Sequence, residues 1–225
     1  MMDNIFKEFF SHQYEEDINI RLLENDYVFP QDMFHNYLSD LIEIDIREYF
    51  RWLDEHFSAS VLSIDDAVQF SDFHDATSGI VEALLSAGDY GYSYIEIGKK
   101  LQNDGISRTE WAYRKYGENH AKTATYLGYL FSINRCCYVS AIGYSLSSFT
   151  DTEQMKLFAR LFTRTTLFKS IYYLTRSGIV DLRELFDMLT RETYIRRRSS
   201  IKKLYKNLIL AEPECNEIFK RIDFS

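Results

Sequence analysis

The chain has little cysteine, proline and glycine, and each shortage excludes a class of protein. Its 225 residues include only 3 cysteines, 2 prolines and 9 glycines. Two of the cysteines, Cys136 and Cys137, are adjacent, so the spacing offers neither a disulfide framework nor a zinc site. The scarcity of glycine and proline argues against collagen-like, loop-rich and β-sandwich architectures, and long helices are expected. No apolar run approaches the ~20 residues that a membrane-spanning helix needs. The N-terminus also lacks a secretory-signal pattern, so we expect a cytoplasmic protein without a membrane partner.

The motifs of nucleotide binding and nucleophilic catalysis are also missing. The chain contains no G-x-x-x-x-G-K-[ST], G-x-G-x-x-G or G-x-S-x-G. Its five histidines stand apart from other ligands at metal-binding spacing. Asp89, Glu96 and Lys99 loosely resemble the acid–acid–lysine cluster of metal-dependent nucleases, but a helix cap with Ser93 explains Glu96 better. We therefore expect no enzyme, no cofactor and no metal.

Charge is unevenly spread along the chain, although the total is only −8. Residues 1–75 hold 18 acidic and 4 basic residues, a balance of −14, whereas residues 76–225 hold 16 acidic and 22 basic residues, a balance of +6. An acidic total therefore does not exclude binding to nucleic acid. We expect an acidic helical module over residues 1–74, and the 17 Tyr and 17 Phe predict a core rich in ring contacts.

Residues 75–149 predict a series of helices followed by a β-hairpin. A helix over 76–87 precedes two capping boxes, Ser93–Glu96 and Ser107–Glu110, each of which should open a helix. In the helix over 118–130 the small and apolar residues recur every third position and should face inward. Its open side is then expected to carry Asn119, His120, Lys122, Thr123 and Tyr126. Alternating segments on both sides of Asn134-Arg135 predict a hairpin with a two-residue turn.

A basic segment, Thr190–Leu210, closes the pattern. Ile201, Leu204, Tyr205 and Leu208 follow the spacing i, i+3, i+4 and i+7, which predicts one buried stripe on a helix. Seven basic residues and one acid lie between positions 191 and 206, and we expect these cations on the open side. They are Arg191, Arg196, Arg197, Arg198, Lys202, Lys203 and Lys206. A merely solvated helix surface is the simpler interpretation of such a basic run.

Two stretches resemble a known group of folds. The series YIEIGKKL, HAKTATYLGYL and VSAIGYSL resembles the winged helix-turn-helix pattern of bacterial proteins, and LFDMLTRETYIRRRSSIKKLYKNLI resembles a second helix-turn-helix. Together they are similar to tandem winged-helix regions of bacterial restriction-modification, defence-associated and transcription-regulator proteins. The resemblance covers about 150 residues from position 75 onward and implies a mainly α fold with a first winged helix-turn-helix over 75–149. A helical connector and second helix-turn-helix would follow over 150–225, with short β-hairpin wings. Residues 218–224 are expected to form a short strand or a wing.

The leading hypothesis is a double-stranded DNA-binding protein that regulates or assists a bacterial defence or restriction-type system. The cations of the basic helix would contact phosphates, with one or two arginines reaching guanine edges. The outward residues of the helix over 118–130 would do the same, and Arg135 at the wing tip would reach the backbone or minor groove. Such a protein would be associated with the nucleoid when bound, and the aromatic N-terminal helices would supply a homodimer contact.

Two alternatives remain open at this stage. The chain could be a protein–protein adaptor or inhibitor subunit that uses a winged-helix scaffold, because fold does not fix function. The acidic module would then contact the partner, or would mask the basic helix. A weaker alternative is the DNA-recognition subunit of a restriction nuclease.

Overall fold

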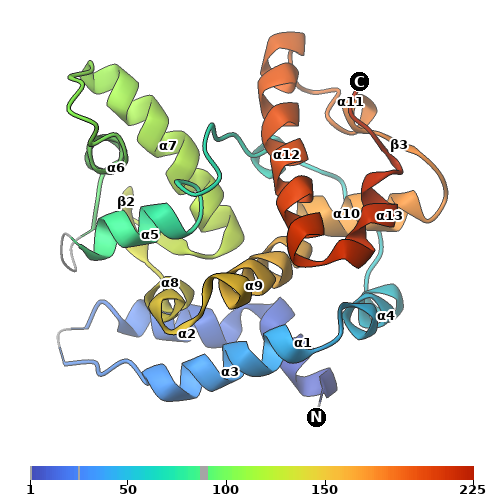
Figure 1. Cartoon of the computed structure of the whole chain (residues 1–225), viewed down its shortest axis with the longest axis horizontal. Helices are drawn as coiled ribbons and strands as arrows, with labels where there is room; N and C mark the ends of the chain where they lie inside the picture. Colours follow the sequence, from blue (N-terminus) through green and yellow to red (C-terminus); the bar gives the residue numbers. More distant parts are fainter. Residues whose placement is uncertain (1, 25, 87–90) are drawn as a thin grey trace. The chain divides into compact units, whose positions relative to one another are not determined.

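Helices dominate the chain, as the scarcity of glycine and proline predicts, and only two small two-stranded sheets occur among the described residues. The computed structural model describes residues 2–24, 26–86 and 91–225 (Figure 1). The chain divides into two compact units: the first combines Met1–Leu41 with His74–Thr150, and the second combines Ile42–Phe73 with Asp151–Ser225. The acidic residues 1–74 are thus shared between two cores, because Phe9 and Leu38 are buried in the first unit and Tyr49 and Leu53 in the second.

The first unit packs N-terminal helices together with a middle segment of helices and a hairpin. Its elements are α1 (Met2–Ser11), α2 (Gln13–Arg21), most of α3 (Gln31–Glu43), α5 (Ser78–Leu85), α6 (Tyr94–Leu101), α7 (Glu110–Leu127), β1 (Leu130–Ile133), β2 (Cys136–Val139), α8 (Ala141–Ser145) and η2 (Leu146–Ser148). The expected end of the helix over 76–87 lies outside the described residues. Asn19 accepts a hydrogen bond from the Ala141 N–H at 2.8 Å, which joins α2 to the start of α8.

Two glycines let α6 and α7 touch backbone to backbone. A Cβ on Gly98 would lie 1.9 Å from the Tyr113 carbonyl oxygen, and one on Gly117 would lie 2.0 Å from the Tyr94 carbonyl oxygen. No side chain fits such distances, so the crossing requires glycine on both helices. Ser93 caps α6 in a capping box with Glu96, so the first predicted capping box is confirmed.

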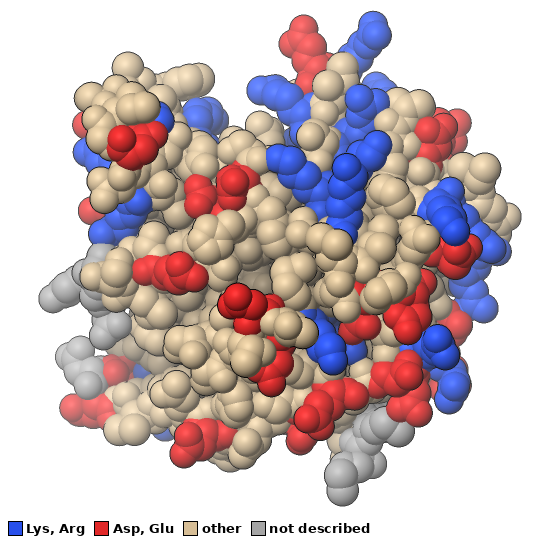
Figure 2. Space-filling model, in the orientation of Figure 1, with Lys and Arg blue, Asp and Glu red and all other residues tan. Residues whose placement is uncertain are grey.

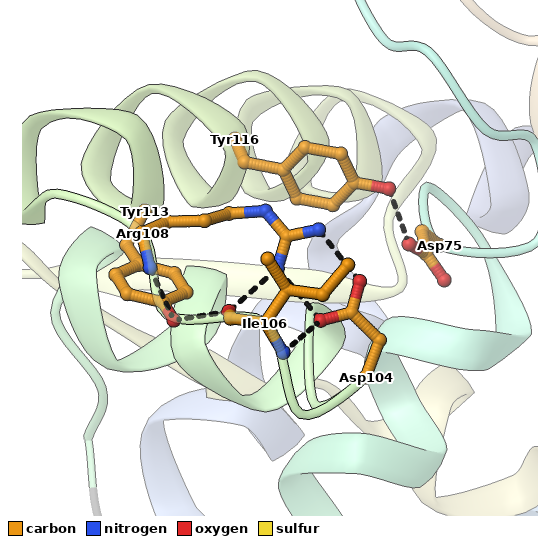
Figure 3. Close-up of polar contacts among 6 residues, drawn as sticks. All are labelled: Asp75, Asp104, Ile106, Arg108, Tyr113 and Tyr116. Carbon is orange, nitrogen blue, oxygen red and sulfur yellow. Dashed lines mark hydrogen bonds and ion pairs between the residues drawn. The ribbon is translucent and has the colours of Figure 1, made fainter.

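The loop between α6 and α7 corrects the second predicted capping box. The cap of α7 is Thr109, whose hydroxyl accepts from the Ala112 N–H, and Ser107 stays in the preceding loop. That loop is fixed by Arg108, which donates to both carboxylate oxygens of Asp104 at 2.7 and 2.6 Å (Figure 3). The bonds to Arg108 and to the Ile106 N–H hold the pKa of the Asp104 carboxyl well below its usual range. This local network places the start of the helix two residues later than the box predicts.

The predicted hairpin is confirmed. β1 pairs antiparallel with β2, with Leu130 opposite Val139 and Ile133 opposite Cys136. Asn134 and Arg135 both have positive φ, 51° and 69°, as the twist of a two-residue hairpin requires. Tyr92, just before α6, adds an antiparallel bridge to Cys137 on the other side of β2.

The second unit surrounds α12 (Arg191–Ala211) with shorter elements. These are α4 (Ile46–His56), η1 (Ile64–Asp66), α9 (Asp151–Thr163), α10 (Thr166–Thr175), β3 (Val180–Asp181), α11 (Leu182–Leu185), η3 (Pro213–Cys215), α13 (Asn216–Phe219) and β4 (Ile222–Asp223). Phe162, Phe168 and Tyr205 pack ring against ring, with centroids 5.2 to 6.0 Å apart. Near the end of α12, buried Arg160 donates to Glu212 at 2.7 Å and to the Ile44 carbonyl at 2.6 Å.

The C-terminal residues contain the short strand β4, one of the two structures expected for 218–224, and no β-hairpin wing. β4 pairs with β3 in parallel. Parallel strands need a long crossover connection, and the segment between β3 and β4, which includes α12, provides it. Between β3 and α12, α11 is a short helix that ends at Leu185.

We expect Gly98→Ala to destabilise the first unit. Alanine is intrinsically better than glycine in a helix by up to about 1 kcal/mol, but the new Cβ would force α6 and α7 apart. Overpacking of this kind costs roughly 1–3 kcal/mol, so the midpoint of thermal unfolding should fall. Lys99→Ala, at the exposed neighbouring position, is the control and should leave it unchanged. An equal or higher midpoint for Gly98→Ala would contradict the close crossing.

Candidate nucleic-acid interface

The basic helix forms with the predicted anchoring face. Thr190 caps α12, its hydroxyl accepting from the Thr193 N–H at 3.3 Å. Ile201, Leu204, Tyr205 and Leu208 are all buried, with 1% exposure or less, which confirms the predicted stripe. The helix is therefore held from one side, and the orientation of its cations follows from this anchoring.

The seven cations of α12 divide into an exposed and a half-buried set. The exposed ones are Arg191, Arg196, Lys202 and Lys206, and the half-buried ones are Arg197, Arg198 and Lys203. Figure 2 shows Lys and Arg side chains gathered over α12. Within the described part of the chain, none of the seven lies at ion-pair distance from a carboxylate. The helix thus keeps its positive charge unpaired.

Two of the cations hold a neighbouring segment instead of facing open solvent, which corrects the expectation for them. We call residues 57–73 the strap. Arg197 donates to the carbonyls of Ile64 and Ala67, and Lys203 donates to the carbonyl of Ser71. Burial lowers the pKa of Arg197, and nearby Asp65 opposes that shift. Both cations therefore contribute to the fold of the second unit.

Serine side chains complete the attachment of the strap. The Ser200 hydroxyl of α12 accepts from the Phe70 N–H and donates to the Phe70 carbonyl, both at 2.9 Å. Ser170 of α10 does the same for Ser60, at 3.2 and 2.9 Å. The hydroxyl of each serine thereby bonds the backbone N–H and carbonyl that a neighbouring β-strand would otherwise bond. The strap therefore needs no neighbouring strand.

A signal for the role of Arg197 is present in the sequence. Extended toward the N-terminus by steps of four and three, the apolar stripe passes from Ile201 to Arg197 and Tyr194. Tyr194 is buried and Arg197 is half-buried, so the buried stripe of α12 begins at Tyr194, before the first aliphatic residue, Ile201. An arginine on such a stripe uses its stem for packing and its guanidinium for carbonyls.

Two further cations lie over aromatic rings near the C-terminal segment. Arg198 donates to the Phe224 carbonyl at 2.8 Å and lies 5.8 Å from the centroid of Tyr194. The Lys202 ammonium lies 5.3 Å from the centroid of Phe224. These contacts orient the side chains without neutralising them, since neither ring carries a charge.

The α7 surface differs more from what the sequence predicts. His120 and Thr123, expected on the open side, are each only 1% exposed. The His120 ring stacks on Tyr116, and its Nδ1 lies 2.8 Å from the Tyr116 carbonyl oxygen. Thr123 donates to the Asn119 carbonyl at 3.0 Å. The buried arc of α7 is wider than a one-sided stripe because α6 packs against it closely enough to cover an additional face.

The remaining predicted residues of the first unit keep partial or full exposure. Lys122 is exposed but pairs with Glu118 at 2.9 Å, and Glu118 also pairs with Lys115 at 3.2 Å. Asn119 and Tyr126 are half-buried, and Arg135 is exposed at the hairpin turn. The outer side of α7 therefore presents much less free positive charge than α12.

Nuclease-like chemistry gains no support from the described residues. Glu96 accepts from the Ser93 N–H and hydroxyl at 2.8 and 2.7 Å, and these bonds lower its pKa. Asp89, the other acid of the loosely nuclease-like series, lies outside the described residues. The described ranges contain no group of three His, Cys, Asp or Glu arranged to hold a metal ion. No helix in them is long and apolar enough to cross a membrane.

Comparisons with known proteins give no family. No family model, no curated protein and no solved structure matches the chain.

We expect Ser200→Ala to loosen the strap. The change leaves the buried N–H and carbonyl of Phe70 without the hydroxyl that serves both, at a cost of roughly 1–3 kcal/mol. Amide hydrogen exchange at Phe70 should accelerate and the free energy of unfolding should fall. Ser199→Ala, at the exposed neighbouring position, should change neither. Unaltered exchange at Phe70 in the Ser200 variant would show that the strap is held by other contacts.

Proposed function

We propose that the chain binds double-stranded DNA, mainly through the phosphate backbone and the outer face of α12. The observation that carries this proposal is the set of unpaired cations on one well-anchored helix. DNA binding releases condensed counterions when Lys and Arg replace them, and this gain needs cations that are free of carboxylate partners. All seven cations of α12 meet that condition within the described residues. Arg197 and Lys203 are in addition bonded to carbonyls of the strap, so we assign phosphate contacts to Arg191, Arg196, Arg198, Lys202 and Lys206.

The order of the elements in the first unit supports the same proposal. Its order is α5, the bridging Tyr92, α6, α7 and then the β1–β2 hairpin, which is the order of a winged helix-turn-helix. In this arrangement Arg135 at the hairpin turn contacts the backbone or minor groove, and Asn119, Lys122 and Tyr126 lie on the helix nearest to DNA. Because Glu118 offsets two lysines of α7, this unit would add less affinity than α12.

The biological role that we propose is that of a regulator or accessory factor in a bacterial defence or restriction-type system. This assignment comes from the resemblance of the sequence to tandem winged-helix regions. The protein would act in the cytoplasm at the nucleoid, by binding rather than by catalysis, and a homodimer would match two-fold DNA sites.

A salt titration tests DNA binding directly. With four to five phosphate contacts, the logarithm of the association constant should fall against the logarithm of salt with a slope of about −4. Lys202→Ala combined with Lys206→Ala should weaken binding and reduce the magnitude of the slope by about 2. Fluorescence anisotropy of a labelled duplex gives both quantities.

The matched control removes two exposed lysines of the same unit outside α12, Lys156→Ala with Lys220→Ala. It should leave most of the slope intact. Affinity that ignores ionic strength, or equal losses in the two double variants, would rule out α12 as the DNA-binding surface.

A protein–protein adaptor is the second candidate, favoured by one observation. Trp111, in the first turn of α7, is 70% exposed, and large aromatic residues are enriched where proteins bind one another. An adaptor would lose its protein partner on Trp111→Ala and keep it on neutralisation of Lys202 and Lys206. The reverse pattern, with DNA as the ligand, is what the leading proposal requires.

A further inference from the structure

The outer cations of α12 fall along two edges of the helix. Arg191, Arg198, Lys202 and Lys206 are spaced by seven, four and four residues, which keeps them along one side. We call this set the open edge. Arg196 and Lys203 are seven residues apart and follow a second line, which we call the strap edge because Lys203 donates to Ser71 of the strap. The two edges have different neighbours.

The strap presents negative groups to its edge. Three of its carbonyls, those of Ile64, Ala67 and Ser71, accept hydrogen bonds from Arg197 or Lys203. It also carries exposed Asp65 and Asp72, and Asp65 lies near enough to Arg197 to influence its pKa. A phosphate backbone would likewise bring negatively charged oxygen atoms next to cations. The carbonyls and carboxylates of the strap therefore play the same electrostatic part.

Two carboxylates near the open edge are held by backbone N–H groups. Burial raises the pKa of nearby Tyr194, and the carboxylates of Asp181 and Asp223 contribute to that rise. Each already accepts a backbone N–H, from Arg183 and Ser225 respectively, at 2.7 and 2.8 Å. Neither lies at ion-pair distance from a cation of α12 within the described residues. Charge on this edge remains available to a polyanion.

We infer that the strap acts as an intramolecular polyanion and confines a bound nucleic acid to the open edge. This inference rests on the proposed function and adds the path of the phosphate backbone along α12. Arg191, Arg198, Lys202 and Lys206 contact phosphates, and Lys203 stays with the strap. Like-charge repulsion from Asp65 and Asp72 keeps the polyanion away from the strap edge.

Lysine footprinting of the full chain distinguishes the two edges. The protein is acetylated with an N-hydroxysuccinimide ester with and without a duplex, and the modified lysines are quantified by mass spectrometry. Lys202 and Lys206 should be protected several-fold by DNA, while the ratio at Lys203 stays near that of Lys156 and Lys220. Protection of Lys203 equal to that of Lys202 would overturn the inference and leave DNA binding standing. Absence of protection throughout, together with no binding in the salt titration, would overturn both.

Charge substitution in the strap provides the second test. Asp65→Asn with Asp72→Asn should raise DNA affinity several-fold and bring Lys203 into the protected set. The control, Glu214→Gln with Glu217→Gln, removes the same charge from exposed positions of the same unit outside the strap. It should raise affinity less and leave Lys203 unprotected. Equal gains in the two double variants would show a general charge effect and overturn the inference.

Discussion

Burial of the apolar stripe of α12 is the interaction on which the second unit depends. Each of its four large side chains contributes roughly 1.5–3 kcal/mol when removed from water, whereas an exposed charge pair contributes about 0–1 kcal/mol. The stripe therefore sets the rotation of the helix, and the cations take the positions that remain. Tyr205 joins the ring contacts of Phe162 and Phe168, so the stripe is linked to a cluster of aromatic side chains.

Sequence periodicity predicts local structure well, but it predicts less well which polar side chains are buried or bonded to distant segments. The mainly helical fold, the capping box at Ser93 and the two-residue turn at Asn134-Arg135 follow from short-range patterns, and the structure contains all three. The strap could not be predicted, because its partners lie about 130 positions away in sequence. The burial of His120 could not be predicted either, since it depends on how closely Gly98 and Gly117 let two helices approach.

The acidic first third of the chain does not form a separate structural module. Its residues are divided between two cores, and only those from Ile42 to Phe73 belong to the unit that contains α12. That unit holds 18 acidic and 17 basic residues, so its balance is −1 despite the seven cations on one helix. Any masking of the cations of α12 within this unit is therefore due to the strap and not to the net charge of residues 1–74.

The strap and α4 also make the second unit discontinuous in sequence. Residues 42–73 are synthesised before the helix that receives them, since the bonded residues of the strap and α12 are about 130 positions apart. Loop closure over such a separation slows folding, because the entropy must be lost before the contacts form. Leu62, Val68 and Phe70 are buried in the folded unit, so they stay exposed in the nascent chain until residues 151–225 have been made. Excision of residues 151–225 as a fragment would for the same reason remove part of the wall against which α12 folds.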